Sequence, residues 1–263
     1  MGILNVTPDS FSDGGKFTGT EAALQHAMTM LDEGADIIDV GGESTRPGSA
    51  EVSTDEELRR VIPVITALRA ARPSARISID TRHPEVAAAA LNAGADIVND
   101  ITGLTNPAMR ALCAERPCGI ILMHMQGTPA TMQQNPQYVD VVAEVRNFFT
   151  LQVQQAAAEG ISPERICLDP GIGFGKTTEH NLALIRRLAE LRVQNLPLMM
   201  ALSRKRFIGE LLGDSQLAKK EALPTVVMSL LAAANGADVH RVHDVSALHQ
   251  ALSLRQALQG IQV

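Results

Sequence analysis

The chain has 263 residues, of which 45% are hydrophobic and 20% are charged. This composition is typical of a globular protein and excludes a disordered or low-complexity chain. A net charge of −6 at pH 7 gives no broad basic surface, so nucleic acid is not expected as a partner. No apolar run approaches the roughly 20 residues of a membrane-spanning helix, and we expect no signal peptide. Three cysteines without a CxxC spacing favour a reducing cytoplasm over a disulfide scaffold.

Eight short runs rich in β-branched residues alternate with longer helical patterns along the chain. The predicted strands are, in order, 2–6, 36–40, 75–80, 96–100, 119–124, 165–169, 198–202 and 238–242. The predicted helices between them include 20–33, 54–71, 84–93, 140–159, 179–191 and 224–234. Val61, Ile65 and Leu68, for example, have the spacing that gives a helix one apolar face. Such helices beside nearly apolar strands are typical of a parallel sheet that is covered by helices.

One junction between a helix and a strand recurs three times. The sequence Gly-Ala-Asp followed by Ile or Val begins at Gly34, Gly94 and Gly236. Each glycine stands where a helix is expected to end, a position at which the left-handed backbone conformation favours glycine. Eight alternating units with this repeat predict an α/β fold, a single-domain (β/α)8 TIM barrel over residues 1–263. An open doubly wound sheet is the alternative.

Polar residues stand at the carboxyl end of every predicted strand. They are Asn5, Asp39, Asp80, Asn99, Asp100, His124, Asp169, Ser203, Arg241 and His243. One such residue is more simply explained as a cap of the next helix. Because all eight strands carry one, and because catalytic groups of TIM barrels gather on that face, we interpret them as the lining of a shared site.

Two loops near the start of the chain have the composition of ligand-binding loops. Residues 5–15 form a long loop rich in Ser, Asp and Gly that also carries Phe11, which suits a segment that closes over a ligand. Residues 41–48 combine paired glycines with Thr45 and Arg46, whose hydroxyl and guanidinium groups donate well to phosphate oxygens. Solvent-exposed turns are the simpler alternative for both loops.

Three later segments also carry candidate functional groups. The glycine run 171–175 fits neither a P-loop, because a Pro occupies the first glycine position, nor a dinucleotide fingerprint, so we interpret it as a tight turn that positions Phe174. Residues 203–206 place three adjacent cations after the seventh predicted strand, and Arg241 and His243 share one face of the eighth. Barrels often bind phosphate in this region; a solvent-exposed charge run is the alternative.

Taken together, these segments resemble the dihydropteroate synthase family. The match includes GILNVTPDSFSDGG at 2–15 and DVGGESTRPG at 39–48, and continues at 79–81, 98–101, 122–125, 168–176, 203–205 and 241–244. It therefore runs from the first predicted strand to the last. The resemblance implies a TIM barrel that joins 6-hydroxymethyl-7,8-dihydropterin diphosphate to 4-aminobenzoate, with Mg²⁺ as cofactor, and that forms a homodimer. In this reaction we expect diphosphate to leave before the amine attacks.

The resemblance also assigns each predicted site residue to one part of the reaction. The pterin is expected to contact Asp80, Asn99, Asp169 and Lys205, and the diphosphate to contact Thr45, Arg46, Arg241, Val242 and His243. The 4-aminobenzoate is expected to lie between Pro8, Pro47, Phe174 and Arg206. Asn5 is the expected Mg²⁺ ligand, and the expected catalytic residues are Asp80, Asp9 and Lys205. Arg82 receives no role.

Three other functions fit parts of the pattern. A pterin-binding barrel that transfers a methyl group to a corrinoid shares the acidic pterin contacts but lacks the aminobenzoate loops. A non-catalytic pterin-binding protein is expected to lose Asn5, Lys205 or Arg241, all of which are present. An aldolase would form a Schiff base at a desolvated Lys205, which borohydride trapping would reveal.

Overall fold

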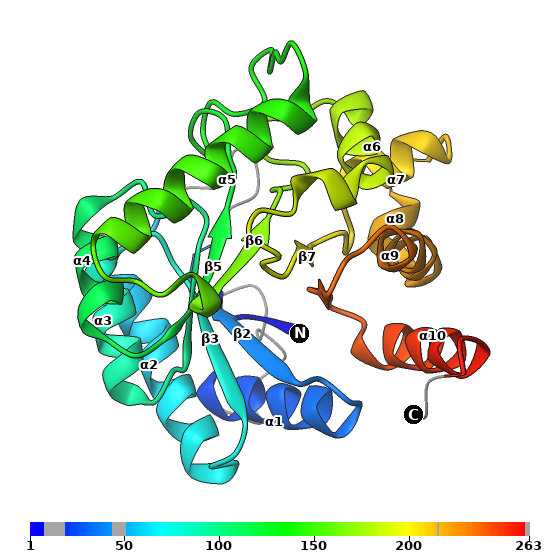
Figure 1. The fold of residues 1–263 in the computed structure, drawn as a ribbon. Coiled ribbons are helices and arrows are strands. Elements are labelled where there is room, and N and C mark those ends of the chain that lie inside the picture. Colours follow the sequence, from blue (N-terminus) through cyan, green and yellow to red (C-terminus); the bar gives the residue numbers. More distant parts are fainter. Residues whose placement is uncertain (8–18, 44–50, 215, 261–263) are drawn as a thin grey trace.

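The computed structural model describes residues 1–7, 19–43, 51–214 and 216–260. Strands and helices alternate, and the helices form a ring around the strands (Figure 1). The strands are β1 (Gly2–Asn5), β2 (Ile37–Gly41), β3 (Arg76–Asp80), β4 (Ile97–Asp100), β5 (Gly119–Met123), β6 (Ile166–Asp169), β7 (Met199–Met200) and β8 (Val239–His240). The α-helices are α1 (Gly19–Asp32), α2 (Thr54–Ala71), α3 (Pro84–Ala93), α4 (Pro107–Glu115), α5 (Val141–Ala158), α6 (Thr178–Arg186), α7 (Arg206–Leu211), α8 (Leu217–Lys220), α9 (Leu223–Ala234) and α10 (Val245–Leu258).

The parallel strands close into a barrel. Strands β1 to β6 pair in sequence order, and β7 pairs with β8. Single bridges between Leu168 and Leu198 and between Gly2 and Val242 join the two sheets. At the second bridge, the Ile3 N–H donates to the Val242 carbonyl at 2.9 Å. The predicted (β/α)8 barrel is therefore confirmed, and the open sheet is excluded.

The observed elements agree closely with the predicted ones, with two differences. Six strands begin and end within one residue of prediction, but β7 and β8 are two residues long because pairing beyond them is reduced to single bridges. The predicted helix 179–191 is interrupted between α6 and a 3-10 turn at Leu188–Leu191. The interruption occurs at Arg187, which leaves the helical conformation with φ −107° and ψ 26°.

The repeated glycines end their helices as predicted. Gly34, Gly94 and Gly236 have φ values of +100°, +109° and +104°. Residues other than glycine rarely adopt this backbone region. At Gly94 the close packing adds a second requirement, because a Cβ there would lie 2.9 Å from Cγ of Arg69. Each junction thus turns the chain from a helix into the next strand.

The pleat of the strands separates two apolar layers. Leu4, Val40 and Ile79 belong to the large core cluster between the strands and the helices. Ile121 and Met199 belong to a smaller cluster inside the barrel. Apolar side chains therefore fill the interior, and the polar residues that follow them mark the carboxyl end of the barrel.

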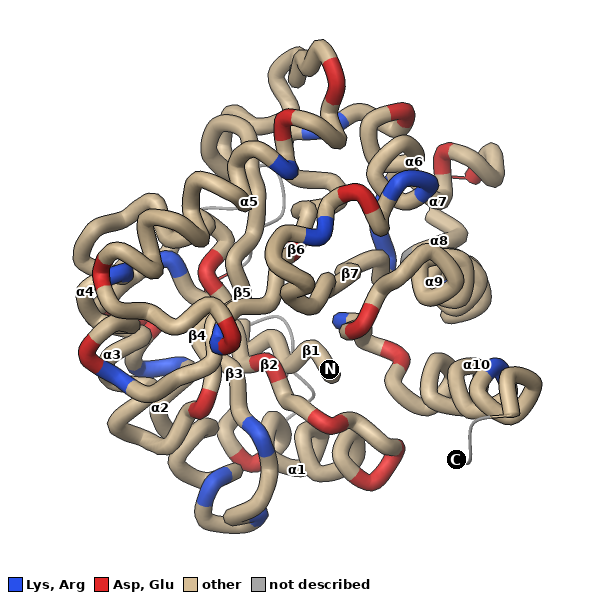
Figure 2. The backbone as a smooth tube through the Cα atoms, in the orientation of Figure 1, with Lys and Arg blue, Asp and Glu red and all other residues tan. Residues whose placement is uncertain are grey.

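The charged residues are distributed around the ring of helices. Figure 2 shows acidic and basic residues interspersed along this ring, in keeping with the small net charge of −6. No helix in the described ranges combines the length and the apolar character needed to cross a membrane.

Candidate active site

Strand register places three predicted site residues side by side at the carboxyl end of the barrel. Asn5 pairs with Gly41, Gly41 with Asp80, and Asp80 with Asn99. Directly paired residues of parallel strands point to the same side, so these side chains face the interior at one level. Gly41 lies between two of them, and a Cβ there would be in van der Waals contact with both, at 3.5 Å from Cβ of Asp80 and 3.9 Å from Oδ1 of Asn5.

A buried ion-pair network connects these strands across the barrel. Arg241, which follows β8, donates from Nε to Oδ2 of Asp39 at 2.6 Å and from Nη2 to Oδ2 of Asp80 at 2.6 Å. Asn99 donates from Nδ2 to the same oxygen of Asp39 at 3.1 Å. Asp39 is fully buried, and among the described residues its Oδ1 has no hydrogen-bond partner. One guanidinium thus holds two carboxylates from different strands, one fully buried and the other 11% exposed.

Burial changes the acidity of the carboxyl groups in this network. Burial raises the pKa of Asp80 to about 7, against the opposing effect of the Arg241 guanidinium, and the negative charge of Asp39 raises it further. Burial also raises the pKa of Asp169, against the opposing hydrogen bond from the Gly171 N–H at 2.8 Å. Asp80 therefore changes charge near neutral pH, a property common in catalytic carboxyl groups.

The loop after β6 brings Phe174 against Lys205. Lys205 Nζ lies 4.4 Å from the centroid of the Phe174 ring, within the range of a cation–π contact. In the same loop, Lys176 is buried and its Nζ lies 3.0 Å from Nδ1 of His124. Burial, followed by the charge of Lys176, lowers the pKa of His124 to about 3, so the imidazole is neutral at physiological pH.

The basic run at 203–206 does not act as one cluster, which corrects the expectation of three cations at the barrel mouth. Arg204 pairs with Asp244 at 3.2 Å, and Arg206 pairs with Glu210 at 2.6 Å. The Arg206 side chain is 83% exposed, because it begins α7 and pairs with a residue one turn later on the same helix. Lys205 is the cation of the run that reaches Phe174.

The two residues that follow Arg241 point in opposite directions, as strand alternation predicts. His243 Nδ1 lies 2.9 Å from Oγ of Ser203. Val242, in contrast, lies in the core, and its N–H donates to the Met1 carbonyl at 3.0 Å. Because this N–H is the only donor of Val242, the expected contact between Val242 and diphosphate has no free donor to form it.

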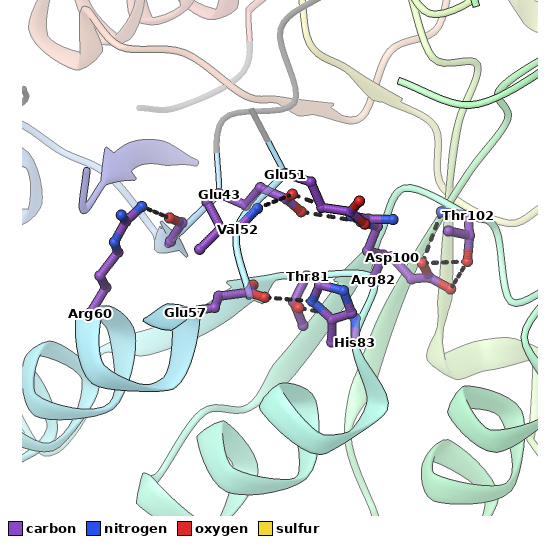
Figure 3. Close-up of polar contacts among 11 residues, drawn as sticks. Glu43, Glu51, Val52, Glu57, Arg60, Thr81, Arg82, His83, Asp100 and Thr102 are labelled. Carbon is purple, nitrogen blue, oxygen red and sulfur yellow. Dashed lines mark hydrogen bonds and ion pairs between the residues drawn. The ribbon is translucent and has the colours of Figure 1, made fainter. Parts of the chain in front are cut away.

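A second polar network surrounds Arg82, to which the sequence assigned no role (Figure 3). The Arg82 Nε donates to Oε2 of Glu43 at 3.1 Å, and Nη2 pairs with Oε1 of Glu51. The Val52 N–H also donates to Glu43, at 3.1 Å. Residues before and after segment 44–50 are thus joined to each other and to the end of β3.

Not every polar strand end contributes to the site. Asp100 accepts from the Thr102 N–H at 2.8 Å (Figure 3) and from the Leu104 N–H at 2.9 Å. It therefore stabilises the turn that follows β4, whereas the next helix, α4, is capped by Asn106. Five of the predicted site residues lie outside the described residues: Pro8, Asp9, Thr45, Arg46 and Pro47.

Sequence reasoning counted Asp39 among the strand ends but did not predict the side-chain contacts of Asp39, Lys176 and Arg82. A signal was available for Asp39, because a charge inside an apolar strand must be paired when it is buried. For Lys176 the signal was weaker: the glycines that precede it indicate a tight turn but not the partners of the lysine. In the described parts of the chain, no group of three or more His, Cys, Asp or Glu residues forms a potential metal site.

Comparisons with known proteins agree with this geometry. Residues 1–243 match the family described as pterin binding enzyme. The dihydropteroate synthase of Synechocystis sp. is 51% identical over 98% of this chain and 89% of its own length, and that of Escherichia coli is 49% identical over 98% and 90%. The solved structure of the Xanthomonas albilineans dihydropteroate synthase with 4-aminobenzoic acid is 46% identical, with a TM-score of 0.92 over 99% of this chain and 93% of that chain.

A second solved structure gives the same result. The Yersinia pestis dihydropteroate synthase with a sulfonamide drug is 44% identical, with a TM-score of 0.90, and the match covers 98% of this chain and 93% of that chain. Sequence likeness and barrel geometry therefore agree over nearly the whole length. The chain belongs to the pterin-binding enzyme family and, within it, to the dihydropteroate synthases.

Proposed function

We propose that this chain joins 6-hydroxymethyl-7,8-dihydropterin diphosphate to 4-aminobenzoate, giving 7,8-dihydropteroate and diphosphate. The observation that carries the proposal is the buried network of Arg241, Asp39 and Asp80 at the carboxyl end of a barrel of this family. Solved structures of the Xanthomonas albilineans enzyme hold 4-aminobenzoic acid in one case and 7,8-dihydropteroate in another. The reported relatives are synthases, which favours this reaction over methyl transfer, non-catalytic binding or aldolase chemistry.

The pterin binds among Asp80, Asn99, Asp169 and Lys205. A pterin edge presents both hydrogen-bond donors and acceptors, and a set of carboxylate, amide and ammonium groups offers the complementary partners. The first two residues are neighbours in the strand register. Asp169 ends β6 and is buried. The buried position strengthens each hydrogen bond to the bound pterin, since water competes less there.

The diphosphate binds at the cationic side of the site. Arg241 and His243 follow β8 and are its proposed contacts, together with Thr45 and Arg46 from the segment after β2. Of these, Arg241 supplies a planar guanidinium that suits phosphate oxygens. In the structure this guanidinium already contacts Asp39 and Asp80, so a proposed diphosphate contact is directly bonded to a proposed pterin contact, Asp80.

Asn5 is the proposed protein ligand of Mg²⁺. Its amide oxygen fits the preference of Mg²⁺ for hard oxygen ligands, and Mg²⁺ commonly completes its shell with water and substrate phosphates. Asn5 is partly exposed at the barrel end, in register with Gly41. When bound, Mg²⁺ stabilises the negative charge of a leaving diphosphate.

The chemical step proceeds by departure of diphosphate before the amine attacks. The C–O bond breaks and diphosphate takes the electron pair, which leaves a methylene cation that the electron-rich dihydropterin stabilises. The Asp80 carboxylate, with Asp9, favours this cation electrostatically. The amine nitrogen of 4-aminobenzoate then forms the C–N bond and loses a proton. Lys205 holds the pterin in place during both steps.

The 4-aminobenzoate binds beside the pterin, between Phe174 and the segments that carry Pro8 and Pro47. The ring of Phe174 offers a flat apolar surface for an aromatic substrate. Arg206 was expected to take part, but its exposed side chain pairs with Glu210. It contributes only if it leaves that carboxylate, so we propose Phe174 as the main contact from this side.

Diphosphate release tests the proposal directly. The protein is mixed with the pterin diphosphate, 4-aminobenzoate and Mg²⁺, and diphosphate is measured over time. We expect release that depends on both organic substrates, and its absence overturns the proposed reaction. Lys205→Ala should abolish turnover, whereas Lys220→Ala, at an exposed lysine of α8, should retain it. Full activity in Lys205→Ala would refute only the role of that residue.

We also propose that the whole chain forms one catalytic domain and that two copies form a homodimer. Large apolar side chains are exposed on α9 at Leu223, Val227 and Leu231 and on the adjacent α10 at Leu254 and Leu258. Their spacing of four residues places them on one face of each helix, and a second copy is the proposed partner. Sedimentation of the protein and of Leu231→Asp tests this: the variant should be monomeric.

The cytoplasmic location stays a prediction.

A further inference from the structure

The backbone around Phe174 is fixed by side chains. Three consecutive carbonyl oxygens, those of residues 173–175, each accept a hydrogen bond from a side chain. The bonds are Gln133 Nε2 to Gly173 O at 2.6 Å, Lys176 Nζ to Phe174 O at 2.9 Å and Tyr138 Oη to Gly175 O at 2.8 Å. Two of the three donors come from the segment between β5 and α5, which is distant in sequence from the loop it contacts. We call Gln133, Tyr138 and Lys176 the Phe174 support.

The geometry of the loop explains why it needs this support. Gly171, Gly173 and Gly175 have φ values of +65°, +82° and +62°, so every second residue adopts the left-handed region. Such a backbone forms neither a helix nor a strand ladder, and its carbonyl groups need other partners. Side-chain donors supply those partners, and they thereby set the position of the residue between the glycines.

Lys176 connects this loop to the barrel wall. Its side chain is buried, and Nζ lies 3.0 Å from Nδ1 of His124, 3.4 Å from the His124 carbonyl and 2.9 Å from the Phe174 carbonyl. The Lys176 amine thus has three hydrogen-bond partners, two of them backbone carbonyls. His124 directly follows β5, and its N–H donates to the Asp169 carbonyl at 2.9 Å. The loop is therefore fixed relative to the strands that carry the proposed pterin contacts.

The supported residue is the one that meets Lys205. The Phe174 ring lies over Lys205 Nζ at 4.4 Å, and a Cβ on Gly173 would lie 3.3 Å from Cδ of the same lysine. A shift of the loop backbone would therefore move the ring and alter the space around the ammonium group.

We propose that Gln133, Tyr138 and Lys176 are positioning residues that hold the Phe174 ring against Lys205 and so set the affinity for 4-aminobenzoate. This inference rests on the proposed function, in which Phe174 contacts that substrate. None of the three needs to contact either substrate itself. Their effect reaches the reaction through the backbone carbonyls at 173–175.

Removal of single donors tests the proposal in the intact enzyme. Tyr138→Phe and Gln133→Leu each remove one side-chain donor. Each should raise KM for 4-aminobenzoate about tenfold, equivalent to about 1.4 kcal/mol for one hydrogen bond, with KM for the pterin diphosphate nearly unchanged. The matched control is Asn235→Leu, which removes a side-chain bond to the Ile185 carbonyl (2.9 Å) at the end of α9 and should change neither KM.

A double-mutant cycle with Phe174→Leu separates positioning from a general loss of stability. If Tyr138 acts through Phe174, then Tyr138→Phe should add no further increase in KM to the Phe174→Leu enzyme. Independent, multiplying effects would overturn the proposal, and so would an unchanged KM for 4-aminobenzoate in both single variants. Failure of the proposed function is distinct, because the unmodified enzyme would then release no diphosphate.

Discussion

The Asp39→Asn substitution tests the buried network most directly. The amide keeps the size of the side chain but removes the negative charge that Arg241 contacts at 2.6 Å. Asp39 is fully buried, and the Arg241 side chain is 17% exposed. Removal of one partner of a buried ion pair typically costs about 3–5 kcal/mol. Because Arg241 keeps Asp80, we expect the lower end of this range, about 3 kcal/mol.

Thermal unfolding measures this loss. For a chain of this size about 3 kcal/mol corresponds to a decrease in Tm of roughly 6–12 °C. Asp36→Asn, at an exposed residue just before the same strand, is the matched control and should stay within about 0.5 kcal/mol of the unmodified protein. An unchanged Tm in Asp39→Asn would refute the view that the network stabilises the barrel.

The same substitution has a second, independent readout in the pH dependence of the reaction. The charge of Asp39 raises the pKa of Asp80, so its removal should lower that pKa below about 7. If the Asp80 carboxylate is required, the rate rises as pH increases through this pKa, and the midpoint should move to lower pH in the variant. The contribution of Asp80 to folding stability has the opposite pH dependence. Because its folded-state pKa is raised, this contribution becomes less favourable as pH rises from about 4 to about 7. An unmoved midpoint would contradict the assignment of Asp80.

Three further outcomes follow from local geometry. Gly171→Ala should lower the free energy of chemical unfolding by more than about 4 kcal/mol, because the new Cβ would overlap the His124 carbonyl. In the control Gly160→Ala the new Cβ meets nothing within 4 Å, so the loss should be smaller and come from backbone strain alone. Arg82→Gln should lower Tm more than Glu51→Gln, because the glutamate is 73% exposed and exposed ion pairs contribute little. Because the folded-state pKa of His124 is lowered to about 3, the free energy of unfolding should fall as pH decreases from about 6.5 toward 3. His124→Asn should reduce this dependence on pH, and an equal dependence in the variant and the unmodified protein would refute the reasoning.

Much of the fold could be predicted because repeated local signals agree. The β-branched runs mark the strands, and glycines such as Gly34 and Gly94 mark the junctions at which helices end. The interrupted helix at Arg187 could not be predicted in this way, because its apolar spacing continues through the break. There the guanidinium bonds to Glu190 and to Asp140, 47 residues earlier, and such a tertiary contact leaves no local pattern.

The site was predictable as a location and much less as a set of contacts. Barrel symmetry gathers strand ends such as Asp80 and Asn99 at one level. It does not reveal that Arg241 contacts Asp39, 202 residues away. Adjacent residues also separate in space, as Lys205 and Arg206 do, because a helix begins between them and turns the second side chain outward.

The β7–β8 pair is joined to the rest of the barrel by one single bridge on each side, so this is the most weakly paired part of the barrel. β7 and β8 contribute two residues each to regular pairing, so backbone amides there should exchange with solvent faster than those of β2 to β5. Arg241 directly follows β8, and its ion pairs with Asp39 of β2 and Asp80 of β3 hold this weakly paired part of the barrel to the strands beyond β1. A ligand that drew the guanidinium away from these carboxylates would loosen the pairing at β7 and β8. By reciprocity, any change that stabilises this pairing through Arg241 should lower the affinity for that ligand.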